Sequence, residues 1–582
     1  MTAAQSTGSG VPPSSIRYQP DERPPEALAF GLGLQMAILQ IAGIVLTPAI
    51  VIRAAGLGEP YLSWAVFAGL TVCGFSTILQ ANRVGRFGAG HVLLMGTSGA
   101  FIAISVAALR EGGPPLLAVL VLVSSLFQFG LAFRLTWLRR VITPTVAGIV
   151  IMLIAATVMP ILFPLLGDVP DGASPLAAPL SAGVALAVFA GLALRGRGVL
   201  RLWAPIIGVV VGSTIGTLTG IFDFEPVRNA GWIGIPTGWP GLDFSFGASF
   251  WALLPAFVFV TLIGAIETIG DSIAIQRVSW RRPQAPDYRV VAGAVAADGV
   301  GNLLSGILGT VPNTTYSNSI SMTELTGVAS RRVGTWIGVS FLGLAMFPKV
   351  AALFLAIPGP VVGAFGLALI GILFSLGMHM VAKDGMSLQK AVIVGLSFWI
   401  GTGFQARAIF PDALEGFWGV LLDNGMTAGG LVAILLMVFL NLTGARPKRL
   451  RGTLDMSAGA KIEDFLRAQA GRRGWDEGST SRLISAGEEA LLTLLEGGAP
   501  GEAEARQLRL TARTGRRSAE LEFVAAAGDL NIEDRMTMMG DRPEVPDESE
   551  ISLRLLKHYA SSVRHQKYHD VDIVTVEVEG RS

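Results

Sequence analysis

The sequence predicts an all-α polytopic membrane protein followed by a soluble C-terminal α/β domain, and three observations lead to this fold class. Of 582 residues, 51% are hydrophobic and 15% are charged, whereas about a quarter are charged in typical soluble domains. The charges are uneven, because 44 of the 87 Asp, Glu, Lys and Arg residues follow Pro447. Apolar runs long enough to cross a bilayer recur before that point. We therefore expect an N-terminal tail over 1–27, a transmembrane domain over 28–445 and a C-terminal domain over 449–582.

Composition also excludes several classes of function. The formal net charge is +1 and no basic domain stands out, which argues against nucleic acid as a partner. Cys73 is the only cysteine, so the chain can form neither an internal disulfide nor a metal site built from several cysteines. The sequence shows no nucleophile paired with a base and no spacing of metal ligands. We therefore expect neither an enzyme nor a bound metal or cofactor.

Twelve apolar runs predict membrane-crossing helices, since about 20 residues span a hydrocarbon core about 30 Å thick. They lie near 28–50, 62–80, 115–133, 141–164, 178–194, 203–221, 248–275, 289–308, 334–356, 359–380, 388–404 and 427–443. Two further segments, 92–109 and 310–328, are apolar in parts but interrupted by Gly, Ser, Thr and Asn. Together these segments predict fourteen crossings.

Basic residues predict the orientation of the crossings. With the N-terminus in the cytoplasm, sixteen Lys and Arg residues fall in cytoplasmic connections and five on the opposite side. Those five are Arg53, Arg110, Arg228, Lys349 and Arg407. This is the excess expected of cytoplasmic loops, and omitting either interrupted segment alone would remove it. We therefore expect both termini on the cytoplasmic side of the inner membrane.

The interrupted segments are the third and tenth crossings, seven apart, which predicts an inverted 7+7 repeat with a binding site where the halves meet. Non-helical backbone at membrane depth must be buried in protein or line a wet cavity. We expect residues 96–99 to precede a half-helix from about Ala100, and the strand-prone residues 310–316 to precede another from about Ser317. Each half-helix would direct free N–H groups into the site. Ordinary kinked helices are the alternative.

Two carboxylates, Glu267 and Asp271, lie inside the eighth apolar run. Their i, i+4 spacing puts both on one face of a helix. An acidic side chain at the bilayer centre costs at least about 2.5–3.5 kcal/mol on insertion scales, so it rarely occurs without a role. Glu267 would accept substrate N–H groups, and Asp271 would relay protons or brace the site. The alternative is a hydrogen-bonded pair that only holds helices together.

Two amides are further candidates for the binding site. Asn318, at the head of the second half-helix, could both donate to and accept from the edge of a heterocycle. It could also serve as a helix N-cap, a role that Asn often fills. Gln35 is a polar residue in the first apolar run, where a role in helix packing and a role in binding are equally open.

These residues fall within motifs that resemble those of the nucleobase–ascorbate transporter family, also called xanthine/uracil permeases. The matching segments are Gly33-Leu34-Gln35, Glu267-Thr268-Ile269-Gly270-Asp271, Asn313-Thr314-Thr315-Tyr316, residues 325–330 and residues 358–363. The resemblance covers about residues 28–443. It implies core and gate domains that move against each other during proton- or sodium-coupled uptake.

The resemblance also implies the roles of individual residues. Glu267 becomes the central substrate-binding carboxylate, and the family's second binding position, Glu or Gln, falls on Asn318. Backbone groups complete the pocket, and they belong to Ser98, Gly99, Ala100, Phe101, Tyr316 and Ser317. Two departures bear on the substrate. The family's Gln/Glu-Asn-x-Gly is Asn318-Ser319-Ile320-Ser321 here, and its His after the first-helix Gln is Met36. Some small planar polar molecule is therefore expected rather than a particular base.

The C-terminal domain has its own pattern of elements. It predicts helices over 479–496 and 550–563 and strands over 507–511, 519–524 and 572–578. This order resembles the ATP-binding fold of anti-sigma factors and histidine kinases. Thr493 stands where that family has a magnesium-binding Asn, and residues 529–533 lack the glycines that allow close approach to the base. We expect a regulatory or dimerisation module that does not bind ATP; an unrelated α/β domain is the alternative.

The sequence thus favours secondary transport of a nucleobase-like solute such as a purine, xanthine or uracil. An anion carrier of the same architecture is one alternative. A membrane sensor, in which the permease part binds ligand and the C-terminal domain signals, is another. The expected partners are the solute and the lipid bilayer. Because family members are often dimers, a homodimer is also considered, as is a regulatory protein bound to the C-terminal domain.

Overall fold

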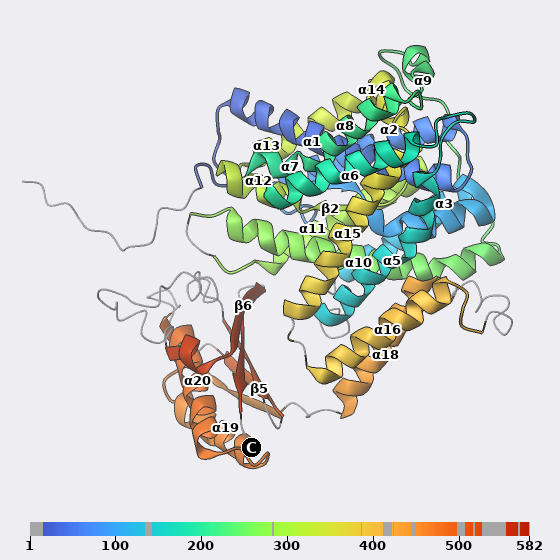
Figure 1. Cartoon of the computed structure of the whole chain (residues 1–582). Coiled ribbons are helices and arrows are strands. Elements are labelled where there is room, and N and C mark those ends of the chain that lie inside the picture. The colour runs from blue at the N-terminus through green and yellow to red at the C-terminus, as the bar shows by residue number, and fades with distance from the viewer. Residues whose placement is uncertain are drawn as a thin grey trace, which may run out of the picture. The chain divides into compact units, whose positions relative to one another are not determined.

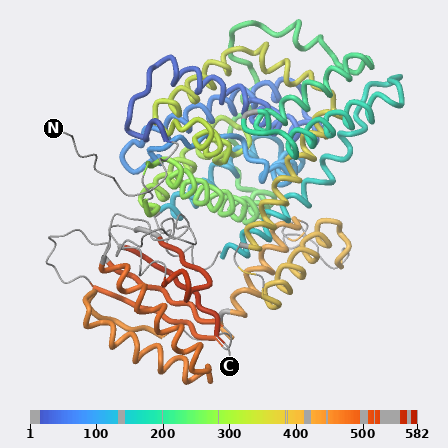
Figure 2. Tube along the Cα trace, turned by 60° about the vertical axis from the view of Figure 1, so that its left-hand side comes forward, coloured from blue at the N-terminus to red at the C-terminus, as the bar shows by residue number. Residues whose placement is uncertain are grey.

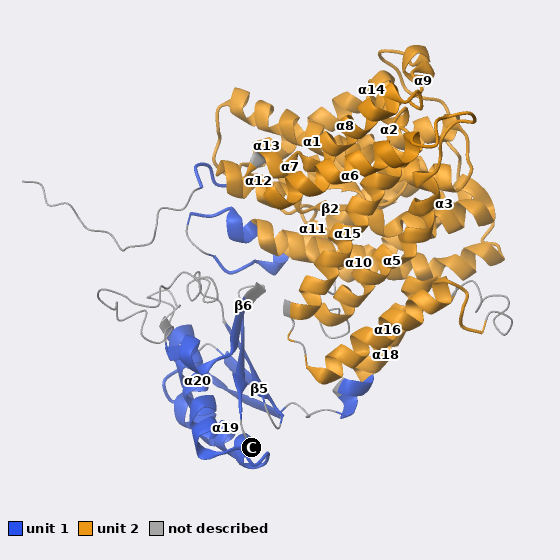
Figure 3. Ribbon diagram, viewed as in Figure 1, with its two compact units in different colours: residues 1–19, 276–290, 439–582 blue, residues 20–275, 291–438 orange. Residues whose placement is uncertain are grey.

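The computed structural model describes residues 16–133, 143–281, 284–383, 385, 387–410, 422, 424–443, 448–496, 507–515, 518–526, 555–568 and 571–580. The chain divides into two compact units, which are described separately (Figure 3). The larger unit comprises Pro20–Ile275 and Val291–Val438. The smaller unit comprises Met1–Gln19, Gln276–Val290 and Phe439–Ser582.

Among the described residues up to Thr443, the regular elements are helices and two short strands (Figure 1). In chain order, the longer elements are α1 (Glu26–Ala54), α2 (Glu59–Asn82), β1 (Leu94–Thr97), η1 (Gly99–Phe101), α3 (Ile102–Phe133), α5 (Pro144–Leu166), α6 (Ala177–Arg195), α8 (Ala204–Leu218), α10 (Ala248–Val278), α11 (Tyr288–Leu308), β2 (Asn313–Tyr316), α12 (Asn318–Thr326), α13 (Arg331–Ala345), α14 (Pro348–Leu355), α15 (Gly359–Lys383), α16 (Leu388–Gln405) and α18 (Gly425–Thr443). The short helices α7 (Val199–Leu202) and α9 (Glu225–Asn229) lie in connections. Cys73 is fully buried in α2.

Eight helical spans among the described residues are long and apolar enough to cross a membrane, which makes this a multi-pass membrane protein. They are α1, α2, η1 with α3, α5, α6, α10, α11 and α15. The count becomes nine if α13 and α14 form one span. Every apolar run expected from the sequence overlaps a helix. The total of fourteen crossings stays a prediction, as does the inverted repeat.

One predicted run is not a single helix. Residues 334–356 form the end of α13 and all of α14, and the two helices meet at an angle of 83°. Pro348 is the first residue of α14, so it lacks the N–H that would continue α13. Phe347 before it takes φ −109° and ψ 83°, outside the helical region that a following proline disfavours. The break is therefore a local consequence of the proline.

Helices α5 and α15 approach each other through glycines. A Cβ placed on Gly148 of α5 would lie 2.5 Å from the Gly377 carbonyl oxygen, and a Cβ on Gly377 would lie 2.6 Å from the Gly148 oxygen. Small residues permit such backbone contact between helices in membranes, where dispersion forces rather than water exclusion hold helices together. The pair therefore sets the distance between α5 and α15.

The Gly377→Ala substitution is expected to destabilise the protein by about 1–3 kcal/mol, because the added methyl overpacks this contact. Gly371 on the same helix is the matched control, since nothing lies within 4 Å of a Cβ at that position. Thermal unfolding of the purified protein in detergent measures both changes. A Gly377→Ala protein as stable as Gly371→Ala would show that α5 and α15 do not rely on this contact.

In the smaller unit, five strands form a sheet with two helices on one face (Figures 1 and 2). The strands are β3 (Lys448–Thr453), β4 (Gln507–Thr514), β5 (Ser518–Ala526), β6 (Ser562–Tyr568) and β7 (Val571–Glu579), in the order β3-β4-β5-β7-β6. All neighbouring strands are antiparallel. Helices α19 (Ala458–Gly471) and α20 (Glu477–Glu496) share one buried core with alternate residues of the strands.

The sequence predicted this sheet in part. The expected strands over 507–511, 519–524 and 572–578 are confirmed as β4, β5 and β7, and the expected helix over 479–496 is confirmed within α20. The expected helix over 550–563 is wrong at its end, because β6 begins at Ser562. Val563 and His565 pair with Val576 and Val574 of β7, so their alternation follows the sheet. Strand β3 and helix α19 were not predicted. Residues 529–533 lie outside the described residues.

Candidate functional site

The candidate site is built on β1 and β2, which lie in the two interrupted segments. The strands pair antiparallel, with Leu94 opposite Tyr316 and Thr97 opposite Asn313. Each strand runs into a helix, since η1 begins at Gly99 and α12 begins at Asn318. Helix α12 ends at Gly327, whose positive φ of 68° suits a residue without a Cβ. The predicted arrangement of part strand and part half-helix is therefore confirmed in both segments.

Glu267 and Asp271 project from α10 and have different surroundings. Asp271 is 7% exposed and accepts hydrogen bonds from Thr315 Oγ1 and Ser317 Oγ, both at 2.7 Å. It therefore links α10 to the junction between β2 and α12. Glu267, one turn earlier, is half-buried and makes no hydrogen bond or ion pair with a described residue. An acceptor with several lone pairs is thus left available at Glu267.

Asp298 on α11 is a third carboxylate near the site. It is fully buried and was not predicted as a site residue from the sequence. It accepts hydrogen bonds from Gln128 Nε2 at 2.6 Å and Thr268 Oγ1 at 2.8 Å. Asn302 Nδ2 donates to Gln128 Oε1 at 2.9 Å, and Asn302 Oδ1 accepts from the backbone N–H of Asn313 at 2.8 Å. This network ties α3, α10 and α11 to the start of β2. Its signal in the sequence was an acidic and two amide residues within apolar runs.

Hydroxyl groups connect the two carboxylate clusters. Thr268 follows Glu267 in the chain and donates its hydroxyl hydrogen to Asp298, whereas Thr315 donates its hydroxyl hydrogen to Asp271. The two hydroxyl oxygens lie 3.5 Å apart. Glu267 lies within electrostatic range of both Asp271 and Asp298. None of the three carboxylates forms an ion pair within the described part of the chain. Three carboxylates without a cationic partner among the described residues therefore lie close together at the site.

Tyr316 of β2 packs against β1 and α1. Its hydroxyl donates to the Thr97 carbonyl oxygen at 2.8 Å. Its ring lies directly against Gly96, where a Cβ would overlap it, and its Oη is 3.3 Å from a Cβ built on Gly43 of α1. The Thr97 hydroxyl in turn donates to the carbonyls of Gly43 and Ile44 at 3.2 and 3.1 Å. Helix α1 is thereby fixed against both strands.

The remaining predicted site residues divide into two groups. Ser98, Ala100 and Phe101 are buried next to Gly99 at the start of the first half-helix, and Phe101 contacts the position of Gly264, one turn before Glu267. Asn318 Nδ2 donates to Gln40 Oε1 of α1 at 3.0 Å. Gln35 is half-buried on the same helix but lies about 140° around it from Gln40. Of these two glutamines, the structure thus joins Gln40 to Asn318.

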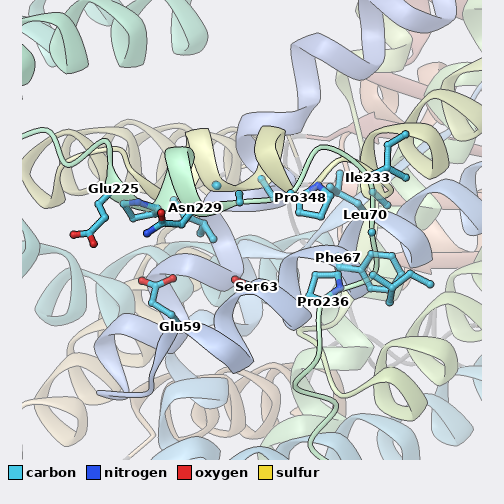
Figure 4. Close-up of a pocket in the computed structure, with 18 of the residues that line it drawn as sticks. Glu59, Ser63, Phe67, Leu70, Glu225, Asn229, Ile233, Pro236 and Pro348 are labelled. Atoms are coloured by element: carbon cyan, nitrogen blue, oxygen red, sulfur yellow. The ribbon is translucent and has the colours of Figure 1, made fainter.

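A further cavity lies elsewhere in the described chain. It has a volume of about 600 Å³ and is lined by residues of α2, α9 and α14, with Glu59 and Glu225 at one end and Phe67 and Leu70 at the other (Figure 4). None of the predicted site residues lines it. We assign the site to the carboxylates, because they lie mid-helix beside interrupted backbone. Over the described ranges, no group of three or more His, Cys, Asp or Glu side chains is placed to hold a metal ion.

Comparisons with known proteins identify the family of the chain. The profile of the xanthine/uracil permeases, described as a permease family, matches residues 28–408. The chain is 29% identical to the xanthine permease XanQ of Escherichia coli (strain K12), over 73% of this chain and 94% of that protein. It is 28% identical to the nucleobase transporter PlUacP of Paenibacillus larvae, over 71% of this chain and 95% of that protein.

Among solved structures, the chain is similar to the transmembrane domain of the cyanobacterium bicarbonate transporter BicA. The TM-score is 0.48 and the identity 14%, over 72% of this chain and 100% of that chain. A likeness at that level does not bear on function here. The family match, in contrast, spans 381 of the 582 residues and includes both interrupted segments and the carboxylates of α10. The chain therefore belongs to the xanthine/uracil permease family.

Proposed function

We propose that this protein is a secondary transporter that takes up a nucleobase-like, small planar solute such as a purine, xanthine or uracil. The solute class is supported by the family of the chain and by its relatives, which include a xanthine permease and a nucleobase transporter. The observation that carries the proposal is the Glu267 carboxylate, which has no partner among the described residues and lies beside two strand–helix junctions. Such a carboxylate would accept hydrogen bonds from the N–H groups of a heterocycle.

The other site residues have proposed roles in the same pocket. Asn318 contacts the solute edge, and Tyr316, Ser317, Ser98, Gly99, Ala100 and Phe101 form the walls and offer backbone groups. Gln35 remains a candidate of α1. Asp271 and Glu267 carry the coupling to a proton or a sodium ion. Thr268 and Thr315, which donate to Asp298 and Asp271, lie 3.5 Å apart, and this closeness of the acids supports proton transfer among them.

The architecture of the transport unit completes the proposal. We infer fourteen crossings in an inverted 7+7 repeat, with both termini in the cytoplasm and with core and gate domains that move against each other. The two interrupted segments, paired through β1 and β2, support the repeat. The excess of basic residues on one side supports the orientation. A homodimer and a regulatory protein at the C-terminal domain remain the proposed partners, and no cofactor is required.

Uptake of radiolabelled solutes into inverted and right-side-out vesicles tests the function. The panel should contain xanthine, hypoxanthine, guanine, uracil and uric acid, with bicarbonate and sulfate as anions. Accumulation of a base under an imposed proton or sodium gradient is the expected result, and the gradient that drives it identifies the ion. Binding of a base without any flux would favour the membrane sensor, and uptake of an anion alone would favour the anion carrier.

The C-terminal domain is proposed to be a regulatory or dimerisation module that does not bind nucleotide. On the proposed resemblance to histidine kinases, Thr493 stands where that family has a magnesium-binding Asn. Its hydroxyl donates to the Glu489 carbonyl oxygen at 2.7 Å, one turn back in α20. This bond orients the hydroxyl along its own helix. Titration of the full-length protein with MgATP up to millimolar concentration is therefore expected to give no heat of binding. Saturable binding would overturn this assignment of residues 449–582.

A further inference from the structure

The amides of Asn318 and Gln40 form a pair that joins two distant parts of the chain at the site. Asn318 begins α12 and is exposed, whereas Gln40 lies within the 29-residue apolar helix α1 and is 5% exposed. Asn318 Nδ2 donates to Gln40 Oε1 at 3.0 Å. A neutral amide within an apolar helix needs a hydrogen-bond partner, and Asn318 supplies it.

This bond joins the amino group of one amide to the carbonyl oxygen of the other and leaves one carbonyl oxygen and one amino group of the pair unbonded. Each primary amide has two N–H donors and one carbonyl acceptor. The Asn318 Oδ1 acceptor and the Gln40 Nε2 donor make no bond with another described residue, and neither is sealed from solvent without a partner. Exchanging O and N in both amides leaves the same complement, one acceptor and one donor. The pair therefore presents two adjacent groups of opposite hydrogen-bonding character.

We propose that Gln40 is a specificity-determining residue, which with Asn318 binds the edge of a base that carries an N–H next to a C=O. This inference rests on the proposed transport of nucleobase-like solutes. The substrate N–H donates to one amide oxygen, and the Gln40 or Asn318 amino group donates to the substrate carbonyl. Xanthine, hypoxanthine and uracil all have such a lactam edge.

The pairing also explains how a short side chain can serve this position. Asn318 reaches one methylene less far than Gln, and Gln40 supplies the second group from α1. The hydrogen bond between them fixes both amides before a ligand arrives, so binding loses less side-chain entropy. An edge with two donors or two acceptors would leave one of these polar groups unpaired, and sites built to hydrogen-bond a ligand reject such mismatches strongly.

Two substitutions at Gln40 test the proposal, with uptake of radiolabelled xanthine into vesicles as the measurement. Gln40→Met keeps the length of the side chain and removes its donor, so the KM for xanthine should rise about tenfold while the maximal rate changes less than about twofold. Ile38→Met is the matched control. It places the same residue in the same helix, about 200° around from Gln40, at a side chain that is 41% exposed. Its KM should equal that of the wild type.

Gln40→Glu tests the edge itself. With Asn318 still donating to position 40, the pair then presents two acceptors, which match the adjacent N1–H and N2–H groups of guanine. The inhibition constant for xanthine uptake should therefore fall about tenfold for guanine relative to that for hypoxanthine, when the variant is compared with the wild type. In the Asn318→Ala background, adding Gln40→Met should raise the KM by less than the tenfold seen for Gln40→Met alone. The effects of substitutions at two residues that bond each other are not additive.

The outcomes separate this inference from the proposed function. If the wild type accumulates no base, the proposed function fails and the role of Gln40 fails with it. If the wild type transports xanthine but Gln40→Met leaves KM unchanged and Gln40→Glu leaves the competitor order unchanged, the role of Gln40 alone is refuted. Should Gln40→Met fail to reach the membrane, the competitor order of Gln40→Glu decides.

Discussion

Replacing Glu267 by Gln should lower base uptake by at least about 100-fold. A hydrogen bond to a charged group contributes about 1.5–3 kcal/mol, and the amide also turns an NH₂ group toward a substrate N–H, which adds an unpaired donor. The substitution changes the volume little and breaks no hydrogen bond or ion pair with a described residue, since Glu267 makes none. Stability in detergent should therefore stay near that of the wild type. The loss would thus lie in binding and coupling.

Radiolabelled uptake and ligand-induced thermal stabilisation, measured together, test this expectation. Glu324→Gln is the control, because it removes the same charge from an exposed position of α12. Glu324→Gln should transport like the wild type. Full uptake by Glu267→Gln would refute the assignment of Glu267 as the substrate ligand. Retained stabilisation by xanthine without uptake would instead limit its role to ion coupling.

The second large effect is expected from Gly96→Ala. A methyl group at position 96 would overlap the Tyr316 ring, which is held between Gly96 and Gly43 by the hydrogen bond to the Thr97 carbonyl. The ring cannot move without separating β1 from β2, so the junctions of both half-helices shift. A displacement of about 1 Å at a site can cost about 100-fold in rate. We expect a loss of transport of that order.

Three companion variants show whether the cause is local. Gly343→Ala places a methyl group where nothing lies within 4 Å, and it should leave uptake unchanged. Tyr316→Phe removes the hydroxyl but keeps the ring, so it should cost about 0.5–1.5 kcal/mol of stability. Adding Gly96→Ala to Tyr316→Ala should lower the unfolding temperature no further than Tyr316→Ala does alone, because the ring that the methyl group would overlap is gone. Wild-type uptake by Gly96→Ala alone would show that the strand pair tolerates displacement.

The sequence predicted the membrane elements well because their physical signal is strong. An apolar run of about 20 residues has few alternatives to a helix in a protein interior or a bilayer. Each such run contains a helix in the structure. The interruptions at residues 96–99 and 310–316 could be recognised because Gly, Ser and Thr do not continue an apolar helix. The bend between α13 and α14 was missed, although Pro348 marked it.

The site was predicted less completely, since hydrogen bonds between distant segments are not visible in a periodic pattern. Glu267 and Asp271 were found from their charge, but Asp298 is equally charged and lies in an apolar run that was interpreted as an ordinary crossing. Gln40 was passed over in favour of Gln35, which belongs to a family motif. The bond to Asn318 depends on the register of α1 against α12, which only the folded chain specifies.

The burial of Cys73 makes the protein a natural background for site-directed labelling. Its thiol is enclosed in α2 and no other cysteine occurs in the sequence, so a polar maleimide should leave the wild type unmodified under native conditions. A cysteine introduced at an exposed position such as Ser317 would then be the single reactive thiol. Comparing its labelling from the two sides of the membrane would report which side the site faces, and no native cysteine has to be replaced first.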